Sequence, residues 1–141
     1  MELVSSNHPA LRKKSLPIVK GEFDVEALSN EMFSIVESRG IGLAAPQLGL
    51  NVRLFVVNLL GEKRVFINPK IVKKYGVLSS KEEGCLSLPN IFVKVARHSK
   101  VFVEYYDLNW TKRKEVFSDT LARVIQHEQD HLNGKLIIDY I

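Results

Sequence analysis

The chain has 141 residues, the length of one ordinary domain, and we expect residues 1–141 to fold as a single domain. Its composition, 45% hydrophobic and 26% charged, is close to the average of soluble globular proteins. The net charge of +4 lies in short scattered basic groups, which indicates solvated faces. A weak attraction to an anionic surface such as ribosomal RNA is the alternative, but no motif for specific nucleic-acid binding is present.

The N-terminal segment and the cysteine usage bear on location. The first fifteen residues, MELVSSNHPALRKKS, have no apolar core stretch and therefore do not predict a secretory signal. No segment approaches the ~18 apolar residues that a membrane span needs. The single cysteine, Cys85, cannot form an internal disulfide. We expect a cytoplasmic protein with no membrane partner; an organellar protein that has lost a targeting segment is the alternative.

The first predicted element is an amphipathic helix from Asp24 to Arg39. Asp24 can cap its first turn, apolar residues recur at helical spacing, and Gly40 can end it. The segment that follows, GIGLAAPQLG (40–49), contains glycines and a proline that argue against a continuing helix.

Short runs rich in β-branched and aromatic residues fill the middle of the chain. Each has the length of a strand and is bounded by Gly, Pro, Asn or Asp. The runs are 52–58, 64–75, 91–95, 100–107 and 112–117. Hairpin connections between neighbours would make the sheet antiparallel or mixed.

A second helix is predicted to begin at Ser118 or Asp119, either of which can cap it, and to run to about Leu132, with Gly134 as its stop. The order of helix, several strands and helix predicts an α+β fold with antiparallel or mixed β-sheets and an N-terminal helix.

The second helix carries the motif His127-Glu128-Gln129-Asp130-His131. Residues four apart on a helix lie about 40° apart around its axis and one turn along it, so both imidazoles can reach one ion. Glu128 lies close enough to act beside that ion as a general base rather than as a ligand. The alternative is a pair of histidines on an ordinary half-buried helix face. If the motif binds metal, the β-sheets would pack around a metal-binding helix.

A catalytic site of this kind needs a third protein ligand. Downstream of the motif the chain offers only Asp139, and the position of the third histidine in one known pattern is Ile137. The third ligand must therefore come from upstream, where the candidates are Cys85, His8, His98 and several carboxylates. Cys85 is favoured, although a free cysteine is more often a small buried apolar residue.

Three separated segments resemble the signature motifs of the peptide deformylases. These segments are GIGLAAPQ (40–47), EGCLS (83–87) and QHEQDHLNG (126–134). Their order and spacing also fit, and the N-terminal HPALRKKS resembles the opening segment of the family. Three motifs in the correct order are more specific than one HExxH, and the resemblance covers nearly the whole chain.

The resemblance implies a metal-dependent hydrolase with Cys85, His127 and His131 as ligands of one divalent ion. Fe²⁺ is implied as the physiological ion, and Zn²⁺, Ni²⁺ or Co²⁺ also suit one thiolate and two imidazoles. The implied reaction is hydrolysis of the formyl group from N-formylmethionyl peptides emerging from the ribosome, with release of formate. A metal-bound water would attack the formyl carbonyl, and Glu128 would be the general base.

Further residues of the motifs acquire roles from the same resemblance. Gln47 and the backbone N–H of Leu86 would stabilise the developing oxyanion. Ile41 would line the methionine pocket, and Gly42 would let the substrate backbone approach. The resemblance also implies that Glu83 and Arg97 form an ion pair behind the cysteine segment. Separately, we expect the protein to be a monomer.

Two features depart from the family pattern. The chain stops at Ile141, where bacterial members usually continue into a helix that docks on the ribosome, so direct ribosome attachment is in doubt. A naturally minimal form and a shortened chain both explain this. Phe92 stands where many members carry a basic residue, so peptide preference is expected to differ.

The rival functions are a metalloprotease, which leaves GIGLAAPQ and EGCLS unexplained, and an inert peptide-binding module.

Overall fold

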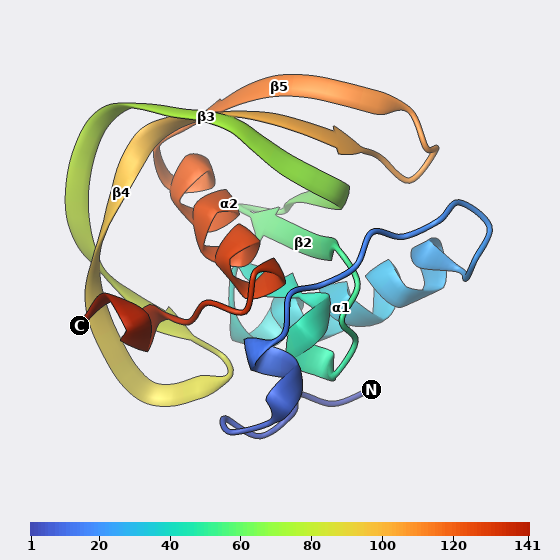
Figure 1. Cartoon of the computed structure of the whole chain (residues 1–141), viewed down its shortest axis with the longest axis horizontal. Coiled ribbons are helices and arrows are strands. Elements are labelled where there is room, and N and C mark those ends of the chain that lie inside the picture. Colours follow the sequence, from blue (N-terminus) through green and yellow to red (C-terminus); the bar gives the residue numbers. More distant parts are fainter.

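A strongly curved antiparallel sheet wraps around the C-terminal helix in the computed structural model, which describes residues 1–141 (Figure 1). The sheet has five strands in the order β1-β2-β3-β4-β5, and every neighbouring pair is antiparallel. The strands are β1 (Gly42–Ala44), β2 (Leu54–Leu59), β3 (Glu62–Cys85), β4 (Leu88–Tyr106) and β5 (Lys112–Ser118). The helices are α1 (Val25–Arg39) and α2 (Asp119–Leu132), with short 3-10 turns at Pro9–Arg12, Ala45–Leu48 and Ile137–Tyr140. The predicted α+β class is confirmed.

Helix α1 forms where the sequence predicts it. The Asp24 carboxylate accepts a hydrogen bond from the backbone N–H of Ala27 at 3.0 Å, which satisfies one free donor of the first turn. Met32 and Val36 on its inner face are fully buried against the sheet. Gly40 follows the last turn in an extended conformation, so the helix ends there as predicted.

Strand β2 explains how one sheet supports two cores. Side chains alternate between the two faces of a strand, and β2 is covered on both faces. Leu54 and Val56 pack in the cluster with α1, whereas Phe55 and Val57 pack in the cluster with α2, and all four are 0% exposed. The sheet therefore has α1 on one face and α2 on the other.

The strands differ from the prediction in length. The expected strands 91–95 and 100–107 are parts of one continuous strand, β4, and the strand expected at 64–75 continues as β3 to Cys85. Irregularities in the β3–β4 register, such as that between Tyr75 and Leu78, let the pair bend without ending. The short strand β1 was not predicted.

Helix α2 has the predicted extent but not the predicted cap, because the Ser118 side chain makes no capping hydrogen bond. Farther along the helix, the Gln126 amide donates to the carbonyl of His98 at 2.8 Å and so ties the helix to β4. Gly134 follows with φ +74°, and a Cβ there would lie 2.5 Å from the Arg12 carbonyl oxygen, so only glycine fits.

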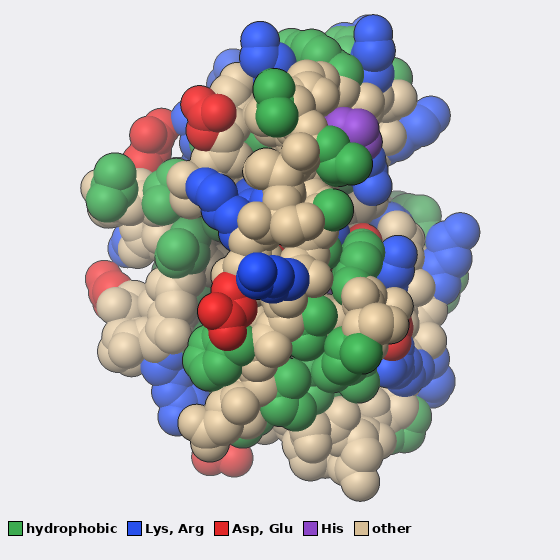
Figure 2. All heavy atoms as spheres, turned by 90° about the vertical axis from the view of Figure 1, so that its left-hand side faces the viewer, with side chains coloured by type: hydrophobic (Ala, Val, Ile, Leu, Met, Phe, Trp, Pro, Cys, Tyr) green, Lys and Arg blue, Asp and Glu red, His purple; other side chains and the backbone are tan.

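The outer surface gives no sign of one dominant charge on the face shown in Figure 2. Lys and Arg side chains there are interspersed with acidic and apolar ones. Neither α1 nor α2 combines the length and the apolar character that crossing a bilayer would require.

Candidate metal centre

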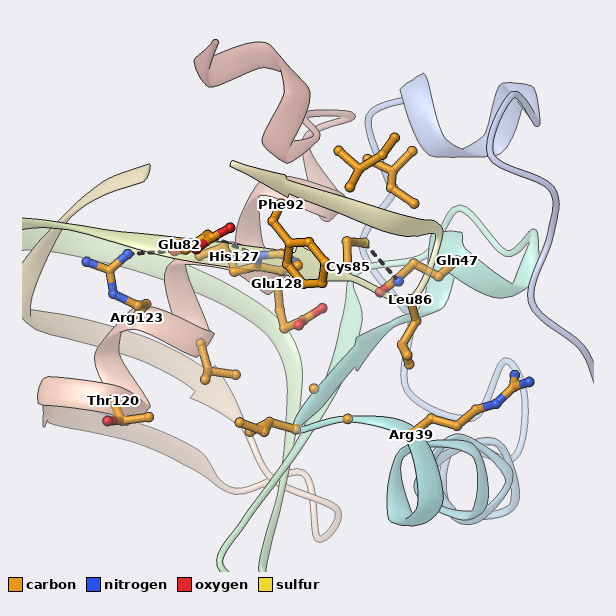
Figure 3. Close-up of a pocket in the computed structure, with 18 of the residues that line it drawn as sticks. Arg39, Gln47, Glu82, Cys85, Leu86, Phe92, Thr120, Arg123, His127 and Glu128 are labelled. Carbon is orange, nitrogen blue, oxygen red and sulfur yellow. Dashed lines mark hydrogen bonds and ion pairs between the residues drawn. The ribbon is translucent and has the colours of Figure 1, made fainter. Parts of the chain in front are cut away.

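A cavity of about 480 Å³ lies where the end of β3 meets β1 and α2 (Figure 3). Of the eight residues predicted to bind metal, catalyse or bind substrate, seven line it, namely Ile41, Gly42, Gln47, Cys85, Leu86, His127 and Glu128. The eighth, His131, lies behind this lining and is 2% exposed. The fold therefore brings residues from three distant segments to one place.

Cys85, His127 and His131 form one cluster of potential metal ligands. Each offers one ligand atom, and these atoms all lie within 4.8 Å of one another. Cys85 Sγ is 3.3 Å from His131 Nε2, and the two imidazole rings, one helical turn apart, have centroids 5.1 Å apart. The other upstream candidates do not join the cluster, because His8 caps the first 3-10 turn and His98 lies on β4.

The surroundings of His127 favour a positive charge beside Cys85 and Glu83, which a proton on the ring supplies here and a bound cation would supply in its place. Its Nδ1 lies 2.9 Å from Oε1 of Glu83, so the carboxylate fixes the ring and directs Nε2 away from itself. Burial lowers the pKa of His127, but hydrogen bonds to Cys85 and Glu83 and the charge of Glu128 outweigh it and raise the pKa to about 10.

His131 is the opposite case. Burial, with the positive charges of His127 and Arg97, lowers its pKa to about 3. A neutral imidazole offers one unprotonated ring nitrogen, which is the form that binds metal. One thiol, one neutral imidazole and one imidazole backed by a carboxylate converge here, and this donor set fits a divalent transition-metal ion.

Glu128 has the properties of an acid–base catalyst. It is 4% exposed, lines the cavity, and its Oε1 has no hydrogen-bond partner in the protein. Burial raises its pKa to about 7, with the negative charges of Glu83 and Asp130 also raising it and the charge of His127 opposing. A carboxyl group with a pKa near neutrality can both accept and donate a proton.

Gly42 lies against the Glu128 carboxylate in the lining of the cavity. A Cβ at position 42 would lie 2.6 Å from Glu128 Oε2, closer than real Cβ contacts allow. The absence of a side chain at this position therefore makes room for the carboxylate itself, a reason for glycine that the sequence did not suggest.

Gln47 is held so that its amide nitrogen faces the cysteine. Its Oε1 accepts from the backbone N–H of Ala44 at 2.9 Å, while its Nε2 donates to Ser87 Oγ at 3.0 Å and lies 3.6 Å from Cys85 Sγ (Figure 3). Leu86 lines the cavity beside Cys85. Gln47 is 2% exposed, so its orientation is fixed before any ligand binds.

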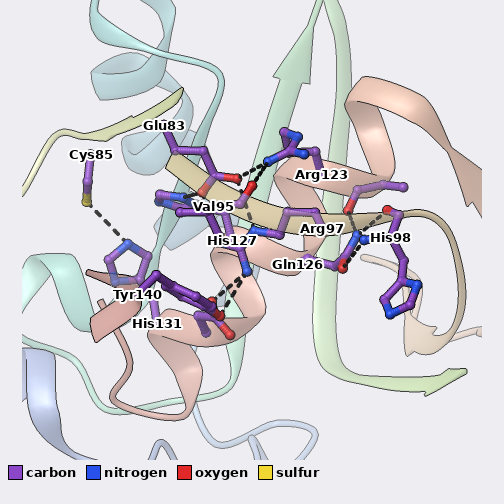
Figure 4. A network of polar contacts seen from close by, with 12 residues as sticks. Glu83, Cys85, Val95, Arg97, His98, Arg123, Gln126, His127, His131 and Tyr140 are labelled. Carbon is purple, nitrogen blue, oxygen red and sulfur yellow. Dashed lines mark hydrogen bonds and ion pairs between the residues drawn. The ribbon is translucent and has the colours of Figure 1, made fainter. Parts of the chain in front are cut away.

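Sequence reasoning missed Arg123 and only partly anticipated the polar network around Glu83 (Figure 4). The expected ion pair is present, with Arg97 Nη2 2.8 Å from Glu83 Oε1, and Arg97 Nη1 also contacts Asp130 at 2.7 Å. Arg123 lines the cavity and contacts Glu83 at 2.7 Å. Its position four residues before His127 on the same helix was the available signal.

Phe92 also lines the cavity and is 64% exposed.

A helix that presents two imidazoles and an intervening carboxyl group, beside a cysteine from a neighbouring strand, defines a metallohydrolase. The polypeptide deformylase family model matches residues 1–141, so the chain belongs to this family of enzymes.

Individual relatives agree with this membership. The chain is 48% identical over 137 residues to the peptide deformylase of Karelsulcia muelleri, with 93% of this chain and 72% of the relative covered. It is 46% identical to the peptide deformylase of Treponema pallidum (strain Nichols), with 100% of this chain and 88% of the relative covered.

Solved structures of lower sequence identity share the fold of this chain. A peptide deformylase from Synechococcus elongatus in complex with actinonin has a TM-score of 0.94 at 38% identity, with 99% of this chain and 78% of that chain covered. The Thermotoga maritima peptide deformylase has a TM-score of 0.93 at 37% identity, with 98% of this chain and 95% of that chain covered.

Proposed function

We propose that this enzyme hydrolyses the formyl group from the N-terminal formylmethionine of nascent peptides and releases formate. The observation that carries the proposal is the convergence of Cys85, His127 and His131 beside the buried carboxyl group of Glu128 in one cavity. The family and its relatives support the choice of substrate.

Cys85, His127 and His131 would hold one divalent ion, for which we propose Fe²⁺ physiologically and Zn²⁺, Ni²⁺ or Co²⁺ as substitutes. One soft thiolate and two imidazoles suit all of these ions. When bound, the ion supplies Lewis-acid chemistry that makes water a nucleophile near neutral pH.

Protein side chains and a backbone N–H group then transfer the proton and stabilise the developing negative charge. Glu128 takes a proton from the attacking water and returns it to the amine that leaves, a task suited to its raised pKa of about 7. Gln47 Nε2 and the backbone N–H of Leu86 donate to the oxyanion that forms at the formyl carbon. Loss of one such donor typically costs on the order of 3 kcal/mol of barrier.

The cavity would bind the start of the peptide. Ile41 lines it for the methionine side chain, and Gly42 borders the path of the substrate backbone. We further propose that residues 1–141 act as one catalytic domain, as a monomer in the cytoplasm, on chains emerging from the ribosome. The bacterial relatives support this setting.

An anaerobic assay of the Fe²⁺-loaded protein with formyl-Met-Ala-Ser tests the proposal. Formate and free methionyl amino termini should appear in equal amounts, and elemental analysis should find about one metal ion per chain. Acetyl-Met-Ala-Ser is the matched control substrate and should yield little acetate. Cleavage of internal peptide bonds without formate would show a protease instead.

A further inference from the structure

The carboxylate of Glu83 accepts four hydrogen bonds, two at each oxygen (Figure 4). Oε1 accepts from Arg97 Nη2 at 2.8 Å and from His127 Nδ1 at 2.9 Å. Oε2 accepts from Arg97 Nε at 3.0 Å and from Arg123 Nη1 at 2.7 Å. A carboxylate has about four lone-pair sites, so this one is saturated and its plane cannot turn without breaking a contact.

Arg123 connects three elements through one guanidinium group. Besides Glu83 it donates to the carbonyl of Val95 on β4 at 2.9 Å and to that of Ser79 on β3 at 2.6 Å. Its side chain is only 14% exposed. Arg123 itself belongs to α2, one helical turn before His127, so the two side chains reach Glu83 from the same face of the helix.

This arrangement links the helix that carries His127 and His131 to the strand that carries Cys85. Glu83 stands two residues before Cys85 on β3, and Arg97 belongs to β4. Among the four hydrogen bonds to the carboxylate, only those from Arg123 and His127 come from α2. Without Arg123, the imidazole of His127 would be the sole link from the helix to this carboxylate, and a buried lone pair of Glu83 would lose its donor.

We propose that Arg123 is a positioning residue for the metal centre. It acts through Glu83 to hold α2 against the strand that carries Cys85, and so keeps the sulfur and the two ring nitrogens at ligand spacing. The inference rests on the proposed function only in taking Cys85, His127 and His131 as metal ligands.

The test is Co²⁺ binding to Arg123→Met and Arg123→Lys, by competition with a chelator. Outer-shell partners of metal ligands typically affect affinity by 10–100-fold, and Arg123→Met should weaken Co²⁺ by about 10-fold. Arg123→Lys should lose less, because an ammonium group can still reach Glu83 but cannot span both carbonyls. At saturating Co²⁺ the thiolate charge-transfer band should also change in Arg123→Met.

The matched control is Arg64→Met. Arg64 is also partly buried and pairs with two carboxylates, Glu62 at 2.8 Å and Glu115 at 3.7 Å, but it lies away from the metal cluster. This variant should bind Co²⁺ within about twofold of the parent and give the parent spectrum.

A double-mutant cycle separates action through Glu83 from general loosening. In a Glu83→Gln background, Arg123→Met should weaken Co²⁺ much less than it does in the parent. Parent-like Co²⁺ binding in Arg123→Met, an equal loss in Arg64→Met, or an undiminished loss in the Glu83→Gln background would each overturn the proposal. If Arg123→Met does not fold, Arg123→Lys against Arg64→Lys decides by the same criteria. These measurements need no turnover, so a failure of the formate assay leaves them intact.

Discussion

Helix α2 faces two very different interiors. Toward the sheet, Ile125 and Leu132 are fully buried in a cluster of aliphatic and aromatic side chains, in which the rings of Phe55 and Phe66 stack at 4.8 Å. Toward the cavity, the same helix places Arg123 and His127 on the buried carboxylate of Glu83 (Figure 4). These are the apolar side and the polar side of α2.

Different interactions stabilise the two sides of α2. Burial of apolar area is non-directional, so many residues of suitable size can stabilise the apolar side. On the polar side each donor must meet a particular acceptor, because a buried group without a partner costs on the order of 1–3 kcal/mol. We therefore expect substitutions on the apolar side to change stability and leave metal binding near that of the parent. Substitutions on the polar side should change metal binding and catalysis, and they should also lower stability where a buried charge loses its partners.

The largest effect should come from Glu128→Ala, on the polar side. General acid–base catalysis typically contributes 10²–10⁴-fold, so kcat should fall by roughly that factor. Glu128 is outside the cluster of potential ligands, so metal content should remain near that of the parent. Formate release and elemental analysis of the same preparation check both expectations; equal turnover in mutant and parent would remove Glu128 from its role.

Next in size is Phe66→Ala, on the apolar side. The Phe66 ring is fully buried and contacts the rings of Phe55, Tyr105 and Phe117. Truncation should lower the free energy of unfolding by about 3–5 kcal/mol. Urea denaturation measures the loss. Co²⁺ affinity and kcat, determined well below the melting temperature, should stay at parent values, and a large drop in Co²⁺ affinity would break the division between the two sides.

A smaller effect should appear as pH dependence from Glu83. Burial raises the pKa of this carboxyl group, but hydrogen bonds from His127 and Arg97 outweigh it and lower the pKa from 4.5 to about 2. Because the folded-state pKa is the lower one, the stabilisation is complete above about pH 4.5 and is lost as the pH falls toward 2. The difference corresponds to on the order of 3 kcal/mol.

Urea denaturation of the metal-free protein at several pH values between 5 and about 2.5 checks this expectation. Glu83→Gln lacks the titrating group and should show the shallower pH dependence. Parallel curves for the two proteins would mean that the pKa of Glu83 is not lowered by folding.

The apolar side and the helices were largely predictable from the sequence. The cap at Asp24 and the helical spacing of residues such as Met32 and Val36 are local signals, and they predicted α1 correctly. The strands were less predictable. The middle of β3 is mostly exposed and polar, so it lacks the alternation that marks a half-buried strand, and its pairing with β4 depends on contacts distant in sequence.

The site residues also differ in how far local sequence signals predict them. His127 and His131 follow from one local motif, and the structure places them together as predicted. Cys85 is far from them in sequence, so the residues alone favoured it but left other third ligands open, and the family resemblance selected it. Arg123 escaped notice because an arginine on a helix usually faces solvent. Only the fold shows that it meets a buried carboxylate.

The most direct test of the account is X-ray absorption at the zinc edge of the Zn²⁺-loaded protein. If Cys85, His127 and His131 share one ion, the spectrum should contain one sulfur at about 2.3 Å and two imidazole nitrogens at about 2.0–2.1 Å. The sulfur shell should disappear in Cys85→Ser. A parent spectrum with only nitrogen and oxygen ligands would contradict the metal centre described above.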